Sequence, residues 1–118
     1  MNIVTQKEKN VFYKQMRKPT GNQNPYLVQK IMTASPEQLI VYIFDAGIAA
    51  CGQENKVKSM QAVQELINSL NFDHKPVAAT FYSMYRYILD QLHQMNFEEA
   101  KKMLTELRQA WVKAFNLS

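Results

Sequence analysis

The chain has 118 residues, of which 47% are apolar and 20% are charged, and its formal net charge at pH 7 is +4. This length fits one domain that buries about two-thirds of the surface exposed by its unfolded chain. A single cysteine excludes an internal disulfide framework and fits a reducing compartment. The longest nearly apolar run, residues 39–51, is too short to cross a bilayer, and no signal peptide opens the chain. We therefore expect a soluble, cytoplasmic protein with no membrane insertion.

The positive charge lies almost wholly at the start of the chain. Residues 1–30 hold six basic side chains and one acidic side chain, a net charge of +5. Residues 31–118 hold eight basic and nine acidic side chains, a net charge of −1. We interpret residues 1–23 as a flexible basic arm and residues 24–118 as a helical domain, since residues 20–24 are turn and linker types. A body without a basic face argues against nucleic-acid binding.

The first long helix is predicted to run from Pro36 to about Cys51. Ser35 can cap its N-terminus, and Pro36 suits a first turn because the missing N–H costs nothing there. Gln38, three residues after the cap, completes a capping box. Gly52 is expected to stop this helix.

Three more helices follow from apolar residues that recur at three- and four-residue spacing. The second covers residues 54–70, the third begins at Pro76, and the fourth begins at Asn96, with Glu99 as a second capping pattern. Short helical segments are also expected over residues 9–16 and 26–31. Nothing alternates with period two, so the fold class is all-α, an antiparallel four-helix bundle with a mobile N-terminal arm.

The first predicted helix carries more apolar surface than one bundle face needs. One face holds Leu39, Ile40, Ile43, Ala46 and Ala50. The neighbouring face holds Val41, Phe44, Ile48 and Cys51. Either the helix lies at the centre of the fold, or its second face forms the floor of a groove for a partner or for the lead-in.

The third predicted helix shows a weaker form of the same excess. Its core stripe is Phe81, Met84, Tyr85, Ile88 and Leu92. Tyr82 and Leu89 lie on a second side. Aromatic residues at helical spacing are usually core residues. The functional alternative places Tyr82 and Leu89 in the same partner-binding groove as the second face of the first helix.

Nothing in the sequence indicates catalytic, cofactor-binding or metal-binding chemistry. His74 and His93 are far apart, and neither has a partner at metal-ligand spacing. Cys51 lies in apolar sequence without an adjacent base. Three unclustered glycines cannot form a phosphate loop. We expect a protein that is not an enzyme and uses no cofactor.

Six motifs follow one another between residues 24 and 116. They are Asn24-Pro25-Tyr26, Thr33-Ala34-Ser35-Pro36-Glu37-Gln38-Leu39-Ile40, Phe44-Asp45-Ala46-Gly47-Ile48, Leu66-Ile67 with Leu70-Asn71, Phe81-Tyr82-Ser83-Met84-Tyr85-Arg86-Tyr87-Ile88, and Leu107-Arg108-Gln109-Ala110-Trp111-Val112-Lys113-Ala114-Phe115. In this order they resemble the flagellin-export chaperone family, FliS. The resemblance implies a four-helix bundle that binds the disordered C-terminal segment of flagellin. It also implies that binding prevents premature polymerisation in the cytosol and delivers the subunit to the flagellar type III export apparatus.

The resemblance further implies a removable cover over the groove. In the family the Asn-Pro-Tyr lead-in occupies part of the groove and flagellin displaces it, a role that falls here to Tyr26, Leu27 and Ile31. The chain departs from the family pattern in its longer, more basic start and in Phe44, where tyrosine is common. Its joint over residues 51–56 is also shorter by about a dozen residues, on the order of three helical turns.

Two alternative interpretations of the protein's role remain. Residues 96–100, after an aromatic-rich helix, resemble the hairpin of a tetratricopeptide unit, which would make the chain a helical peptide-binding or structural scaffold. No period near 34 residues repeats along the chain, which weighs against a tetratricopeptide array. An exposed apolar face could instead be buried in a homodimer.

Overall fold

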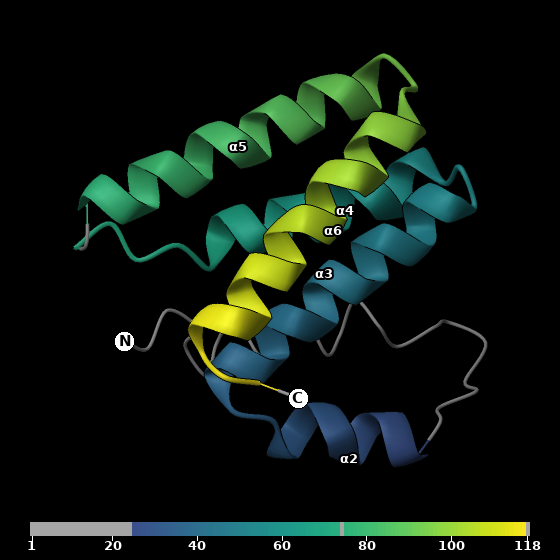
Figure 1. The fold of residues 1–118 in the computed structure, drawn as a ribbon. Coiled ribbons are helices and arrows are strands. Elements are labelled where there is room, and N and C mark those ends of the chain that lie inside the picture. The colour runs from purple at the N-terminus through teal and green to yellow at the C-terminus, as the bar shows by residue number, and fades with distance from the viewer. Residues whose placement is uncertain (1–24, 74, 118) are drawn as a thin grey trace.

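The computed structural model describes residues 25–73 and 75–117. In chain order its helices are α2 (Pro25–Thr33), α3 (Pro36–Gly52), α4 (Lys56–Asn68), α5 (Lys75–His93) and α6 (Phe97–Ala114) (Figure 1). The described residues contain no strand, so the all-α prediction is confirmed. The predicted basic arm, and the short helix expected over residues 9–16, lie outside the described residues.

The predicted helix starts are found where the capping residues stand. Ser35 Oγ accepts a hydrogen bond from the Gln38 N–H at 3.1 Å, and Asn96 Oδ1 accepts one from the Glu99 N–H at 3.4 Å. Asn55 caps α4 in the same way. Each cap satisfies a backbone donor that has no partner inside its helix. The caps predicted at Ser35 and Asn96 are therefore confirmed.

The first long helix ends at Gly52, one residue beyond the predicted end at about Cys51, although Gly52 is not the residue that stops it. Gly52 is still helical, and the residue in the left-handed region is Glu54, with φ of 54°. The Glu54 N–H donates to the carbonyl of Cys51, and the Asn55 N–H donates to the carbonyl of Ala50. This pair of bonds is a Schellman motif, which ends a helix through its hydrogen bonds and not through a glycine alone.

The long helices form a closed bundle in which α3 packs against α4 and α6, and α5 packs against the same two helices. Helix α2 lies at the end of the bundle where α3 begins (Figure 1). Helix α5 meets α6 at their connecting turn, and the two helices then run at an angle to each other (Figure 1), while Phe81 of α5 and Trp111 of α6 remain in ring contact.

Two apolar residues at helix ends lie outside the core. Val57, in the first turn of α4, is 66% exposed, and Ala114, the last residue of α6, is also exposed. Both stand at helix ends, which the neighbouring helices cover less than they cover helix centres. No helix in the described part of the chain is long and apolar enough to span a membrane.

Candidate partner-binding surface

The residues predicted to line a groove occupy different depths in the structure. Val41, Phe44 and Leu89 are buried in the core, with exposed fractions of 1%, 0% and 5%. Ile48 is half-buried, and Tyr82 is exposed. Both apolar faces of α3 are therefore covered largely by the chain's own helices, and a partner could reach Val41 or Phe44 only after an element moved away.

The residues predicted to cover the groove lie on α2. Ile31 is 1% exposed and belongs to the buried core cluster, whereas Tyr26 is 73% exposed. The ammonium group of Lys30 lies 4.6 Å from the centre of the Tyr42 ring on α3, a cation–π contact. The Leu27 side chain lies outside the described part of the structure. Helix α2 is thus anchored through Ile31 and Lys30, while Tyr26 faces solvent.

A series of contacting aromatic rings extends from the core to the surface. The ring of Phe44 lies 6.5 Å from Tyr85, and Tyr85 lies 5.9 Å from Phe81, measured between ring centres. Phe81 contacts Trp111 at 6.2 Å, and Trp111 contacts Phe115 at 4.6 Å. Phe81 and Phe115 are only half-buried. The series of rings therefore connects α3, α5 and α6, and it includes two rings that are accessible to a partner.

Helix α6 is fixed to α3 along its second half. The indole Nε1–H of Trp111 donates to the carbonyl of Glu37 at 2.9 Å, and Arg108 Nε pairs with Asp45 Oδ1 at 2.5 Å. Each contact joins α6 to α3, and among the described residues no side-chain hydrogen bond joins this half of α6 to α5.

The polar tie between α5 and α6 lies close to their connecting turn. Tyr87 Oη donates to Glu99 Oε2 at 2.7 Å. This hydrogen bond raises the pKa of the Tyr87 hydroxyl. Tyr87 lies six residues before the end of α5 and Glu99 lies two residues after the start of α6, so their contact is at the end of the helix pair nearest the connecting turn, which we call the closed end.

Apolar side chains line the parts of α5 and α6 farther from the connecting turn, and we call this surface the α5–α6 face. It consists of Val77, Phe81 and Met84 on α5, Met103 and Trp111 on α6, and Phe115 directly after α6. Val77 is 49% exposed, and Phe81, Met84, Met103 and Phe115 are half-buried. Helical spacing places Val77 and Met84 on the side of Phe81, which contacts Trp111. The face is therefore apolar, incompletely covered and open toward the start of α5.

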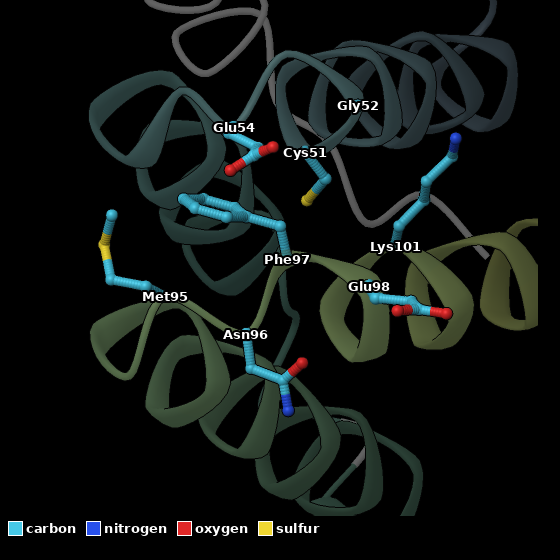
Figure 2. A pocket seen from close by; sticks show the side chains of 8 residues that line it. All are labelled: Cys51, Gly52, Glu54, Met95, Asn96, Phe97, Glu98 and Lys101. Atoms are coloured by element: carbon cyan, nitrogen blue, oxygen red, sulfur yellow. The ribbon is translucent and has the colours of Figure 1, made fainter.

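A separate pocket lies between the α3–α4 turn and the α5–α6 turn (Figure 2). Its volume is about 420 Å³. It is lined by Cys51, Gly52, Glu54, Met95, Asn96, Phe97, Glu98 and Lys101. Glu98 thus lies in this pocket, although its neighbour Glu99 faces α5 through Tyr87.

Comparison with known protein families decides the assignment. The profile of the family described as flagellar protein FliS matches residues 19–117. The chain belongs to the FliS family. No curated protein and no solved structure matched it. FliS proteins are flagellar export chaperones, and the match spans all the described helices, including α2 and the α5–α6 face.

Among the described residues of this FliS chain, no group of three or more His, Cys, Asp or Glu side chains could hold a metal ion. Burial raises the pKa of the Cys51 thiol, which disfavours the nucleophilic thiolate. FliS is a family of chaperones and is not known as a family of enzymes.

Sequence analysis missed part of the candidate surface in this FliS chain. Phe81 and Met84 were assigned to the core stripe, and Val77 and Phe115 were given no role. The signal was present, because Val77, Phe81 and Met84 recur at i, i+4 and i+7. The sequence could not show that α5 runs at an angle to α6 and leaves this stripe incompletely covered.

Proposed function

We propose that this chain is an export chaperone for flagellin. It binds the disordered C-terminal segment of flagellin in the cytoplasm, prevents premature polymerisation there, and delivers the subunit to the flagellar type III export apparatus. The observation that carries this proposal is the FliS match over residues 19–117. Such a role requires a surface that binds apolar side chains, and it requires no catalytic group.

The α5–α6 face is the surface best suited to such a client. A disordered segment that folds on binding can place the apolar side of an amphipathic helix against a stripe of this kind. Phe81 and Phe115 offer half-buried rings, and Trp111 beneath them is held in place by its hydrogen bond to Glu37. Rings fixed in this way lose little side-chain entropy when a client covers them.

Helix α2 supplies the removable cover in this proposal. Its anchor is Ile31, which shares the buried cluster with Val41 and Phe44. Displacement of α2 would remove Ile31 and uncover the part of the cluster beneath it. The groove residues proposed from the sequence would then extend the client surface from the α5–α6 face toward α3. Tyr26 and Leu27 move with α2 in the same step.

Titration calorimetry with a peptide of the flagellin C-terminal segment tests both parts of the proposal. Binding should show a large negative heat-capacity change, because apolar surface is buried as the peptide folds. Ile31→Ala weakens the attachment of α2, so the peptide should bind about threefold to tenfold more tightly, a gain of about 1 kcal/mol. Gln29→Ala, an exposed change on the same helix, should leave the affinity unchanged.

A second pair of variants locates the client. Val77→Ser removes an exposed apolar group from the α5–α6 face, and Val57→Ser removes an exposed one from α4. Val77→Ser should weaken peptide binding severalfold, whereas Val57→Ser should not. Failure of the wild-type chain to bind the peptide would overturn the flagellin proposal itself. Equal effects of the two valine variants would overturn only the location.

A further inference from the structure

A row of charged side chains borders the α5–α6 face along α6. Glu99, Glu106 and Lys113 follow one another at seven-residue intervals, which keeps them on one side of the helix. The contact of Glu99 with Tyr87 shows that this side borders α5. Glu106 and Lys113 are exposed, and Glu99 is half-buried. Along these three residues the charge runs from negative at the closed end of the face to positive at its open end, and the exposed Lys102 stands beside them on the side of α6 turned away from the core.

The fold itself makes little use of this row. In the described part of the chain, Glu106 and Lys113 form no ion pair, and Glu99 accepts only the hydrogen bond from Tyr87. Glu99 at the start of α6 and Lys113 at its end suit the dipole of α6. Glu106 lies in the middle of the helix, where the dipole gives it no role. A carboxylate there, beside an apolar face, is available to a partner.

We infer that the row orients the client helix and sets its register on the α5–α6 face. This inference rests on the proposed function, because it concerns the same client. In paired helices, charges that flank an apolar seam select the orientation and register of the partner. A client helix parallel to α6 places its positive N-terminal end at Glu99 and its negative C-terminal end at Lys113. Its flank then carries basic residues opposite Glu99 and Glu106.

The Tyr87–Glu99 contact adds a boundary to this arrangement. This hydrogen bond holds α5 and α6 together, so a client helix that lies between them cannot extend past it toward the connecting turn. Glu99 Oε2 is engaged by Tyr87, and the second carboxylate oxygen has no hydrogen bond to another described residue. That oxygen is able to accept hydrogen bonds from the free N–H groups of the first turn of a client helix. The helix start is thereby fixed at the closed end of the face.

Charge variants of the full chain test the register with the flagellin C-terminal peptide. Glu106→Lys should weaken peptide binding about threefold to tenfold at low salt, and the loss should shrink as salt rises. The matched control is Glu98→Lys, which introduces the same charge change on the same helix but in the separate pocket between the two turns (Figure 2). The control should change the affinity less than twofold. Equal losses for the two variants would overturn the inference.

Spin labels on the peptide test the orientation directly. A nitroxide at the peptide's N-terminal end should broaden the amide signals of Tyr87 and Glu99 in the nuclear magnetic resonance spectrum of the full chain. A nitroxide at its C-terminal end should broaden those of Val77 and Lys113. The reverse pattern, or broadening of all four signals by both labels, would overturn the inference. A peptide that does not bind at all would overturn the flagellin proposal, so the two failures are distinguishable.

Discussion

Helices α3 and α5 both carry more apolar side chains than one bundle face can hide, and the fold treats them differently. The excess on α3 is buried within the chain, with Val41 and Phe44 almost fully covered. The excess on α5 stays at the surface, where Val77, Tyr82 and Tyr87 are 41–49% exposed. Over residues 75–84 of α5, Ala78 is the one buried residue.

The difference shows what a wide apolar surface measures. The width of the apolar surface indicates how many other helices must pack against a helix. It does not indicate whether those helices belong to the same chain or to a partner. Helix α3 finds its neighbours in α4 and α6, with Ile31 of α2 in the same buried cluster. Helix α5 runs at an angle to α6, so its first half has fewer neighbours of its own (Figure 1). The apolar side chains of α5 that no helix of the chain covers are the reason for placing the client there.

The strongest test of the contrast compares one aromatic ring from each helix. Phe44→Ala should lower the free energy of unfolding by about 3–5 kcal/mol, because it leaves a large cavity in the core. Tyr82→Ala should lower it by about 1 kcal/mol or less, since its main loss is the edge contact with Phe72. Urea denaturation followed by circular dichroism measures both. Comparable losses would mean that the two helices are equally important to the core.

An alkaline titration should reveal the burial of Tyr85 on α5. Burial raises the pKa of the Tyr85 hydroxyl far above the value of about 10 expected in the unfolded chain. The folded state therefore keeps a proton that the unfolded state releases. Stability from this group is complete below pH of about 10 and falls at higher pH by about 1.4 kcal/mol per pH unit.

One variant isolates that effect from other alkaline titrations. Tyr85→Phe should lose the part of the alkaline slope that comes from this hydroxyl. Denaturant midpoints of the wild type and the variant, measured between about pH 9 and pH 11, provide the comparison. The same slope in both proteins would contradict the assignment of Tyr85 to the core.

Much of the fold followed from the sequence because local signals were strong. The caps at Ser35 and Asn96 were predicted from residue type and spacing, and both are present. The all-α class followed from helical periodicity throughout the chain. The residue that stops α3 was not predicted, because the left-handed residue is Glu54, and no rule of residue preference would select a glutamate there.

The candidate surface was harder to predict because it depends on long-range geometry. Periodicity identified Val41 and Phe44 as an excess, but it could not show that the chain's own helices cover them. The exposure of Val77 and Phe115 depends on the angle between α5 and α6, which is set by packing contacts distant in sequence. Residue spacing within one helix carries no information about that angle.

A pair of glycines tests the smallest part of the contrast, the close packing of α3. A Cβ atom at Gly47 would lie 3.2 Å from Leu104 Cδ1 and 3.3 Å from Ala62 Cβ, which leaves little room between α3, α4 and α6. Overpacking of this kind costs about 1–3 kcal/mol, and the better helix propensity of alanine returns about 1 kcal/mol. Gly47→Ala should therefore lower the free energy of unfolding by about 1 kcal/mol.

Gly52→Ala provides the matched control on the same helix. Its Cβ would meet only the flexible end of Lys101, at 3.7 Å, so the gain in helix propensity should remain. This variant should raise the free energy of unfolding by about 0.5 kcal/mol, measured by urea denaturation beside Gly47→Ala. The sign of the difference carries the argument, because both variants add the same methyl group to α3. If Gly47→Ala were stabilising as well, α3 would have spare room at its centre, and the contrast with the open face of α5 would fail.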